Sequence, residues 1–229
     1  ERECSLQRRR QKVWEEAPAA CLDTATRERI CTAAADLARS VSYRGAGTVE
    51  FLYEEAAGEF YFIEMNTRIQ VEHPVTEMVT GIDLVAWMLR IAGGETLSLS
   101  QDDVTLSGHA IEVRINAEDP AMQFMPSPGV VETVKVPPSD AVRFDTMLYD
   151  GYAIPPFYDS LLGKLIVHAP TRDAAIDAMA EALEGLTIVG PKTTIPLHKA
   201  LARDASVRKG AVHTQFLEPW LEAAPLSAD

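Results

Sequence analysis

The stretch from Phe60 to Pro74 constrains the fold more than any other part of this chain. Four apolar residues, Phe60–Ile63, lead into a segment with a polar residue at every second position. These polar residues are Glu64, Asn66, Arg68, Gln70 and Glu72. In an extended chain, side chains at every second position lie on one face. A solvent-facing strand without a function shows the same alternation. The apolar entry and the mixture of carboxylate, amide and guanidinium groups instead favour a site for metal ions and anions.

The residues before this stretch predict its partner strand. Ala56-Ala57-Gly58 is typical of a three-residue loop in an antiparallel hairpin. That loop places Glu50 opposite Glu64, and Glu55 opposite Glu59. A bulge at the loop would shift the register by one residue.

Two carboxylates that face each other across strands repel unless a cation lies between them. Mg²⁺ binds one or two protein carboxylates and takes its other ligands from phosphates and water. Glu50, Glu64 and Asn66 are therefore candidate metal ligands. The alternative interpretation is a pair of surface glutamates beside a turn.

Charge and composition exclude several classes of protein. A net charge of -13 argues against broad nucleic-acid binding, which needs a basic surface. No apolar run approaches the ~18 residues that a membrane span needs. The basic run Arg8–Lys12 is either a solvated face or a local anion site. Cys4, Cys21 and Cys31 are odd in number and lack metal-ligand spacing, so we expect free thiols in a reducing compartment.

The first unit of the chain is expected to end near residue 105. Residues 1–20 read as an extended segment that leads into a turn. Asp23 or Thr24 then caps a helix over about 25–41, with Ile30, Leu37 and Val41 on its buried face. After the hairpin, Asp83 caps a helix that stops at Gly93-Gly94.

The second unit, over 106–229, mixes strands and helices without regular βαβ alternation, which indicates an α+β fold. The expected strands are His109–Asn116, Val130–Val136 and Leu162–His168. Thr171 caps one helix, Thr193 or Thr194 begins another that has Pro196 in its first turn, and a short helix covers about 214–222.

The run from Glu64 through Glu72 to His73-Pro74-Val75-Thr76-Glu77 resembles the signature of the biotin carboxylase family, within the ATP-grasp superfamily. The resemblance extends over nearly the whole chain. It includes Cys4–Arg9, Gln11-Lys12-Val13, Tyr43–Thr48, Arg114–Pro120 and Tyr158-Asp159-Ser160. It implies the carboxyl-terminal half of an ATP-grasp domain over 1–105, followed by a biotin carboxylase C-terminal domain over 106–229.

The resemblance also implies roles for single residues. Glu50, Glu64 and Asn66 would hold the Mg²⁺ or Mn²⁺ that bridges the ATP phosphates. The bicarbonate pocket would contain Lys12, Arg68, Gln70, the backbone of Val71 and Glu72.

Three of the residues would carry the chemistry. Glu72 would deprotonate bicarbonate, a role that suits a carboxylate whose pKa matches the task. Arg68 would offer a fork to a planar oxyanion, and Arg114 would stabilise the ureido oxygen of biotin.

The nucleotide would lie near Gln7 and Leu52, with Ile188 closing that pocket. Arg10 stands where the family has His or Asn and is left out of the set. As alternatives, Arg114 is a structural ion-pair partner and Lys12 is solvated.

The implied enzyme is an ATP-dependent ligase. It converts ATP and bicarbonate to carboxyphosphate and then carboxylates biotin on a carrier protein. The expected partners are that carrier, a carboxyltransferase component, as in acetyl-CoA carboxylase of fatty acid biosynthesis, and a second copy joined through the C-terminal domain. We expect a cytoplasmic protein, or a mitochondrial-matrix protein in a eukaryote.

The chain begins without Met and has no Gly-rich phosphate loop. We therefore expect a fragment that binds ATP poorly and does not turn over alone. The alternatives are another ATP-grasp ligase, such as one that makes carbamoyl phosphate, and a folded module without chemistry.

Overall fold

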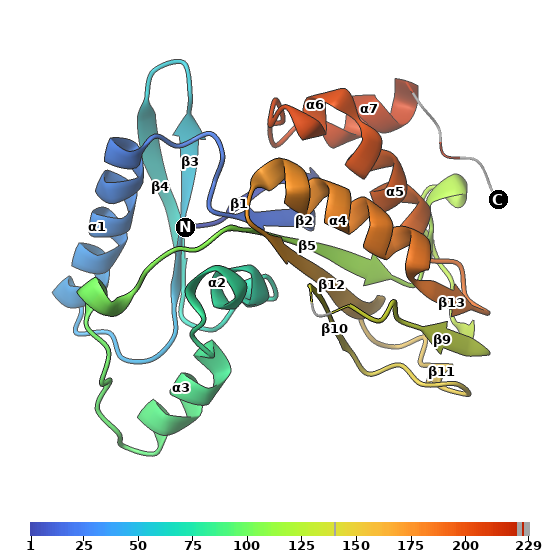
Figure 1. The fold of residues 1–229 in the computed structure, drawn as a ribbon, viewed down its shortest axis with the longest axis horizontal. Helices are drawn as coiled ribbons and strands as arrows, with labels where there is room; N and C mark the ends of the chain where they lie inside the picture. Colours follow the sequence, from blue (N-terminus) through green and yellow to red (C-terminus); the bar gives the residue numbers. More distant parts are fainter. Residues whose placement is uncertain (140, 224–225, 227–229) are drawn as a thin grey trace.

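A five-stranded antiparallel sheet lies at the centre of the molecule (Figure 1). The computed structural model describes residues 1–139, 141–223 and 226. In spatial order the strands are β1 (Glu3–Arg8), β2 (Gln11–Ala17), β5 (His109–Asn116), β12 (Leu161–Ala169) and β10 (Val142–Thr146). The sheet thus joins the first residues of the chain to strands from its second half, across the predicted boundary at 105. The division into units at that residue stays a prediction.

The hairpin of β1 and β2 is a feature that the sequence did not predict. Residues 1–20 are extended, as expected, but they form two paired strands. Arg9 and Arg10 make the tight turn between them, with φ of 47° and 67°. Both central residues of such a turn need positive φ, which Asn and Gly adopt most readily. Arg-Arg is not a sequence signal for this kind of turn, so the sequence did not predict the hairpin.

One face of the sheet carries the main hydrophobic core. Helices α4 (Arg172–Gly185) and α5 (Ile195–Arg203) cover this face. The buried residues of α4 include Ala175, Ile176, Met179 and Leu183, which lie on one side of the helix. Thr171 caps α4 as predicted, by accepting a hydrogen bond from the backbone N–H of Ala174.

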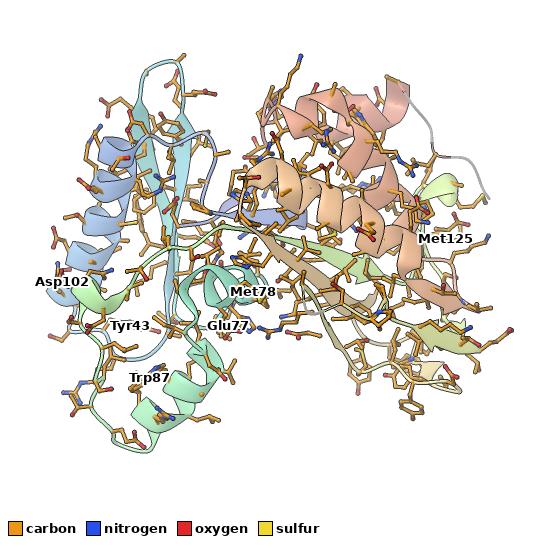
Figure 2. The ribbon with its side chains drawn as sticks, in the orientation of Figure 1. Tyr43, Glu77, Met78, Trp87, Asp102 and Met125 are labelled. Atoms are coloured by element: carbon orange, nitrogen blue, oxygen red, sulfur yellow. The ribbon has the colours of Figure 1, made fainter. Side chains whose placement is uncertain are left out.

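The opposite face of the sheet is covered by a short helix, α2 (His73–Thr80), which the sequence analysis did not identify. Val75 and Val79 of α2 are buried against Ala17, Ala110 and Ile166 of three adjacent strands. Figure 2 shows Glu77 and Met78 on this helix, at the junction of the two halves of the molecule. The placement of α2 decides where the residue before it, Glu72, meets the sheet.

The second β-hairpin stands apart from the sheet and pairs β3 (Thr48–Glu54) with β4 (Glu59–Asn66) (Figure 1). Glu50 lies opposite Glu64, as predicted. The predicted pairing of Glu55 with Glu59 is wrong, because Glu54 lies opposite Glu59 and the loop has four residues. A bulge between Glu50 and Phe51 takes up the extra residue and restores the predicted pairing at Glu50.

The remaining elements agree in part with the sequence. Helix α1 (Thr24–Ser40) begins after Asp23, whose side chain caps it, but Val41 is 62% exposed and lies at the helix end rather than on a buried face. Helix α3 (Leu84–Ala92) ends at Gly93 as predicted. The other helices are α6 (Ala205–Arg208) and α7 (Leu217–Ala223). The short strands are β6 (Glu118–Asp119), β7 (Met125–Pro126), β8 (Gly129–Val130), β9 (Thr133–Lys135), β11 (Ala153–Ile154) and β13 (Thr187–Val189).

The predicted strand over Val130–Val136 is two short strands, β8 and β9, in different two-stranded sheets. Cys4, Cys21 and Cys31 are free thiols, as predicted. No helix among the described residues is long and apolar enough to cross a membrane.

Candidate functional site

The carboxylates of Glu50 and Glu64 converge on one side of the β3–β4 hairpin. The amide nitrogen of Asn66 donates hydrogen bonds to Glu50 Oε1 at 3.1 Å and to Glu64 Oε1 at 3.0 Å. One amide group can reach both carboxylates only if they point to the same side of the hairpin. The arrangement provides two carboxylate donors and, after a half-turn of the Asn66 amide, a third oxygen.

This set of oxygens fits Mg²⁺, which prefers hard oxygen ligands and keeps several from water or phosphate. Among the described residues, no group of three or more His, Cys, Asp or Glu side chains is placed to hold a metal. Glu50 and Glu64 therefore need the amide of Asn66 and outside ligands to complete a shell.

A second group of charges lies beside this pair and joins the hairpin to the sheet. Lys12 Nζ, on β2, lies 2.6 Å from Glu72 Oε1 and 3.4 Å from Glu50 Oε1. Glu72 stands immediately before α2 and is 2% exposed. Burial raises the pKa of Glu72, but the hydrogen bond and charge of Lys12 outweigh this effect, so the pKa lies below its ordinary value. Glu72 is thus an ionised carboxylate at neutral pH.

Arg114, on β5, holds the other oxygen of Glu72. Its NH2 group donates to Glu72 Oε2 at 2.9 Å, and its Nε donates to Glu15 Oε1 at 2.6 Å. Burial lowers the pKa of Arg114, but Glu15 and Glu72 raise it above the ordinary value overall. Lys12 and Arg114 therefore approach Glu72 from two strands, and neither is the solvated side chain that one alternative described.

The remaining predicted anion residues lie around this group, but not on one extended strand. The strand ends at Asn66, and the chain turns before α2 begins at His73, so the five alternating residues do not share a face. Gln70 Nε2 donates to Glu50 Oε1 at 2.5 Å. Arg68 is exposed and donates to Ile69 O and Asn66 Oδ1.

The backbone carbonyl of Val71 accepts a hydrogen bond from Lys164 Nζ at 3.0 Å. Lys164 lies on β12, opposite Arg114 on β5. The turn before α2 is thus tied to the sheet by Lys164 as well as through Glu72.

The predicted nucleotide residues do not all come together. Gln7 is the Cα partner of Lys12, and Leu52 is half-exposed two residues beyond Glu50, so these two belong to the same region. Ile188 lies on β13, and Figure 1 shows β13 and β3 on opposite sides of the molecule. Ile188 lines a different pocket, of about 440 Å³, to which neither Gln7 nor Leu52 contributes. The structure therefore does not bring Ile188 together with Gln7 and Leu52, and its place in the nucleotide pocket stays a prediction.

Several charged residues of the site were missed from the sequence. Arg2 donates to Gln70 Oε1 at 3.2 Å and to the hydroxyls of Thr48 and Thr76. Glu15 binds Arg114, and Lys164 binds the turn at Val71. Neither β1, which begins just after Arg2, nor β2, which carries Glu15, was predicted, so no sequence pattern linked these residues to the Glu50–Glu72 region.

Nearly the whole chain is similar to known proteins. The family model described as "Carbamoyl-phosphate synthase L chain, ATP binding domain" matches residues 1–100, and "Biotin carboxylase C-terminal domain" matches residues 112–219. A biotin carboxylase of Pseudomonas aeruginosa is 55% identical over 218 residues, which are 95% of this chain and 48% of that protein. A pyruvate carboxylase component of Methanothermobacter thermautotrophicus is 50% identical over 220 residues, 96% of this chain and 44% of that protein.

A solved structure has the same fold. The biotin carboxylase domain dimer of the Hydrogenobacter thermophilus 2-oxoglutarate carboxylase, in complex with MgADP, ADP and bicarbonate, superposes with a TM-score of 0.92 at 49% identity. The match covers 95% of this chain and 48% of that chain. The chain spans about half the length of the curated relatives it matches.

Proposed function

The chain belongs to the biotin carboxylase family, and we propose that it supplies the metal- and bicarbonate-binding half of an enzyme that carboxylates biotin with ATP. The observation that carries this proposal is the convergence of two groups of side chains. The oxygens of Glu50, Glu64 and Asn66 lie beside a buried carboxylate, Glu72, that holds two cations. The first group suits Mg²⁺ or Mn²⁺, and the second suits a small anion with a proton to lose.

Within this proposal the metal ligands are Glu50, Glu64 and Asn66. A bound Mg²⁺ would bridge and neutralise the ATP phosphates. Lys12 Nζ reaches both Glu50 and Glu72, so it lies between the metal ligands and the proposed base. That position suits a side chain that holds bicarbonate against the reacting phosphate.

Glu72 is the proposed base. Glu72 is ionised at neutral pH, but the contact with Lys12 that lowers its pKa also makes it a weaker base, so bicarbonate must displace that contact before Glu72 takes its proton. When Glu72 accepts this proton it loses its charge, and its hold on Lys12 and Arg114 weakens. The two cations then become available to the anion that has just gained charge. Lys12 and Arg114 therefore bind the base before proton transfer and the reacting anion after it.

Arg114 also suits the second half-reaction. It lies on the sheet, and its guanidinium is anchored through Nε by Glu15. We propose that its NH groups stabilise the ureido oxygen of biotin when the ureido nitrogen loses its proton. Arg68, which is exposed beside Asn66, is the proposed fork for the planar oxyanion. Gln70 and the backbone of Val71 complete the proposed bicarbonate pocket, and Gln7 and Leu52 the nucleotide contacts.

The proposed partners are a biotin carrier domain or protein, a carboxyltransferase and a second copy of the chain. The relatives include proteins named pyruvate, 2-oxoglutarate and urea carboxylase, so the proposal names biotin as the acceptor and no final acceptor beyond it.

The test joins this chain to the amino-terminal half of the Pseudomonas aeruginosa relative. Bicarbonate-dependent ATP hydrolysis and carboxylation of free biotin are measured for the chimaera, its Glu72→Gln variant and the chain alone. We expect turnover in the chimaera, a loss of at least about 100-fold in the variant, and none in the chain alone. Turnover that survives Glu72→Gln would refute the assignment of the base.

A carbamoyl-phosphate-forming ligase is the second candidate, because the model that matches residues 1–100 carries that description. It does not account for the match of residues 112–219 to a biotin carboxylase domain. Free biotin as acceptor separates the two functions. A chimaera that hydrolyses ATP but leaves biotin unmodified would favour the second.

A further inference from the structure

Two glutamates that the proposed reaction does not use face each other inside the sheet. Glu15 on β2 and Glu112 on β5 are Cα partners in adjacent antiparallel strands, so their side chains lie on the same face, directly opposite each other. Both residues are completely buried, at 0% exposure. Three of their four carboxyl oxygens have no hydrogen-bond partner among the described residues: Glu15 Oε2, Glu112 Oε1 and Glu112 Oε2.

The nearby cations are already held by other groups. Arg114 binds Glu15 Oε1 and Glu72, and Lys12 binds Glu72 and Glu50. Lys164, on β12, binds the carbonyl of Val71 and lies 3.6 Å from Asp145. None of them makes an ion pair with Glu112.

Two adjacent buried carboxylates without a cation between them cannot both stay ionised. Burial and the charge of Glu15 raise the pKa of Glu112 well above its ordinary value, and burial raises the pKa of Glu15 to about 7. The thiol of Cys4, on β1, is the remaining titratable group that faces Glu15, and burial raises its pKa as well. A proton on Glu112 that is donated to Glu15 Oε2 gives partners to two of the three orphaned oxygens.

We propose that Glu15 and Glu112 share one proton and that this pair positions the guanidinium of Arg114. Glu112 carries the proton and donates it to Glu15 Oε2, while Glu15 Oε1 keeps its charge-assisted bond to Arg114 Nε. Loss of the shared proton adds a negative charge beside Glu72 and draws Arg114 toward the pair. The catalytic meaning of the pair rests on the proposed function of Arg114, whereas the shared proton does not.

The shared proton can be tested on this chain by infrared spectroscopy in D₂O at pH 7. The spectrum of Glu112→Gln is subtracted from that of the unaltered chain, and Glu181→Gln serves as the control because Glu181 is exposed on α4. We expect the Glu112 difference to contain the band of a protonated carboxyl, and the Glu181 difference to contain only ionised carboxylate bands. A Glu112 difference without a protonated-carboxyl band would overturn the proposal.

The positioning of Arg114 is tested by its Nε–H resonance in ¹⁵N-resolved NMR, assigned by its disappearance in Arg114→Lys. In the unaltered chain we expect this resonance to move as the pH rises and the pair loses its proton. In Glu112→Gln, whose amide donates to Glu15 Oε2 as the protonated acid does, it should stay at its neutral-pH position throughout. A merely structural Glu112 would leave the two titrations alike, and that result would overturn the positioning role.

Neither measurement depends on turnover. A chimaera that fails to carboxylate biotin, with both spectroscopic results as expected, would reject the function of Arg114 and leave the proton-sharing pair intact.

Discussion

Replacing Glu64 by Gln separates the proposed metal-binding role of the β3–β4 hairpin from its stability. Glu50 and Glu64 face each other, and the Asn66 amide donates a hydrogen bond to each. Opposed like charges on paired strands destabilise by about 0.2–1 kcal/mol. In the absence of divalent ions, Glu64→Gln should therefore raise the free energy of unfolding by about 0.5 kcal/mol.

The effect should reverse when Mn²⁺ is added. A ligand at ten times its Kd stabilises the native state by about 1.4 kcal/mol. Near a protein surface, a pair of unit charges ~4 Å apart attracts by about 4 kcal/mol. Loss of one of two carboxylate ligands should therefore weaken Mn²⁺ binding at least about tenfold. The variant is then less stable than the unaltered chain in Mn²⁺ and more stable without it.

The assay combines thermal unfolding, with and without Mn²⁺, with electron paramagnetic resonance of free Mn²⁺. Glu54→Gln is a matched control, because Glu54 opposes Glu59 at the other end of the same hairpin. That control should give a similar small gain in stability and unchanged Mn²⁺ binding. Equal Mn²⁺ affinity in Glu64→Gln and the unaltered chain would refute the proposed metal site.

Three further predictions concern the buried charges, and urea unfolding checks each of them. Lys12→Met removes the closer cation from Glu72, which is 2% exposed, and should lower the free energy of unfolding by about 3 kcal/mol at pH 7. An unchanged urea midpoint would show that this contact does not contribute to stability. Arg172→Met removes both hydrogen bonds from the guanidinium to Glu16 and should lower the free energy of unfolding by about 3 kcal/mol or more. An unchanged free energy of unfolding would contradict this prediction. Burial raises the pKa of Glu15 to about 7, so below that pH the native pair of Glu15 and Glu112 keeps more protons than the unfolded chain, and stability should fall by about 3 kcal/mol as the pH rises from 4.5 to 7. The fall should be smaller in Glu15→Gln than in the unaltered chain, and identical profiles would contradict the assignment.

Periodicity and capping predicted the helices well, because these signals are local. Asp23, Asp83 and Thr171 each accept a hydrogen bond from a backbone N–H in the first turn of their helix, as their side chains and positions indicate. Helix α2 was missed because its residues continue the signature run after Glu72. The alternation through Glu72 predicts a strand, but the strand ends at Asn66.

The pairing of Glu50 with Glu64 was predictable from the register, although the predicted register omitted two irregularities. A four-residue loop shifts the hairpin by one residue, and the bulge at Glu50 shifts it back. Side-chain alternation does not reveal either irregularity, and only their cancellation kept Glu50 opposite Glu64. A hairpin with the longer loop and no bulge would have placed Glu50 opposite Ile63.

The partners of Glu72 could not be predicted from spacing, because they come from strands that are far apart in the sequence. Lys12 and Arg114 meet Glu72 only after β2 pairs with β5 and α2 covers the sheet. The resemblance to a family named both residues, but it did not supply Glu15, which holds Arg114 in place. Contacts between distant strands depend on the topology, and the sequence left the β1–β2 hairpin undetected.

The face of the sheet beneath α2 shows what the buried charges imply. Half of this face is apolar, where Val75 and Val79 pack on the sheet, so the fold can cover it with a simple hydrophobic layer. The other half buries Glu15 and Glu112, at a cost that hydrophobic residues of similar volume would avoid. The half with the buried glutamates is the one next to Arg114, which in turn contacts Glu72. Local departures from good packing are expected at functional sites. The position of these two glutamates therefore argues that they serve the reaction proposed at Glu72 rather than the stability of the sheet.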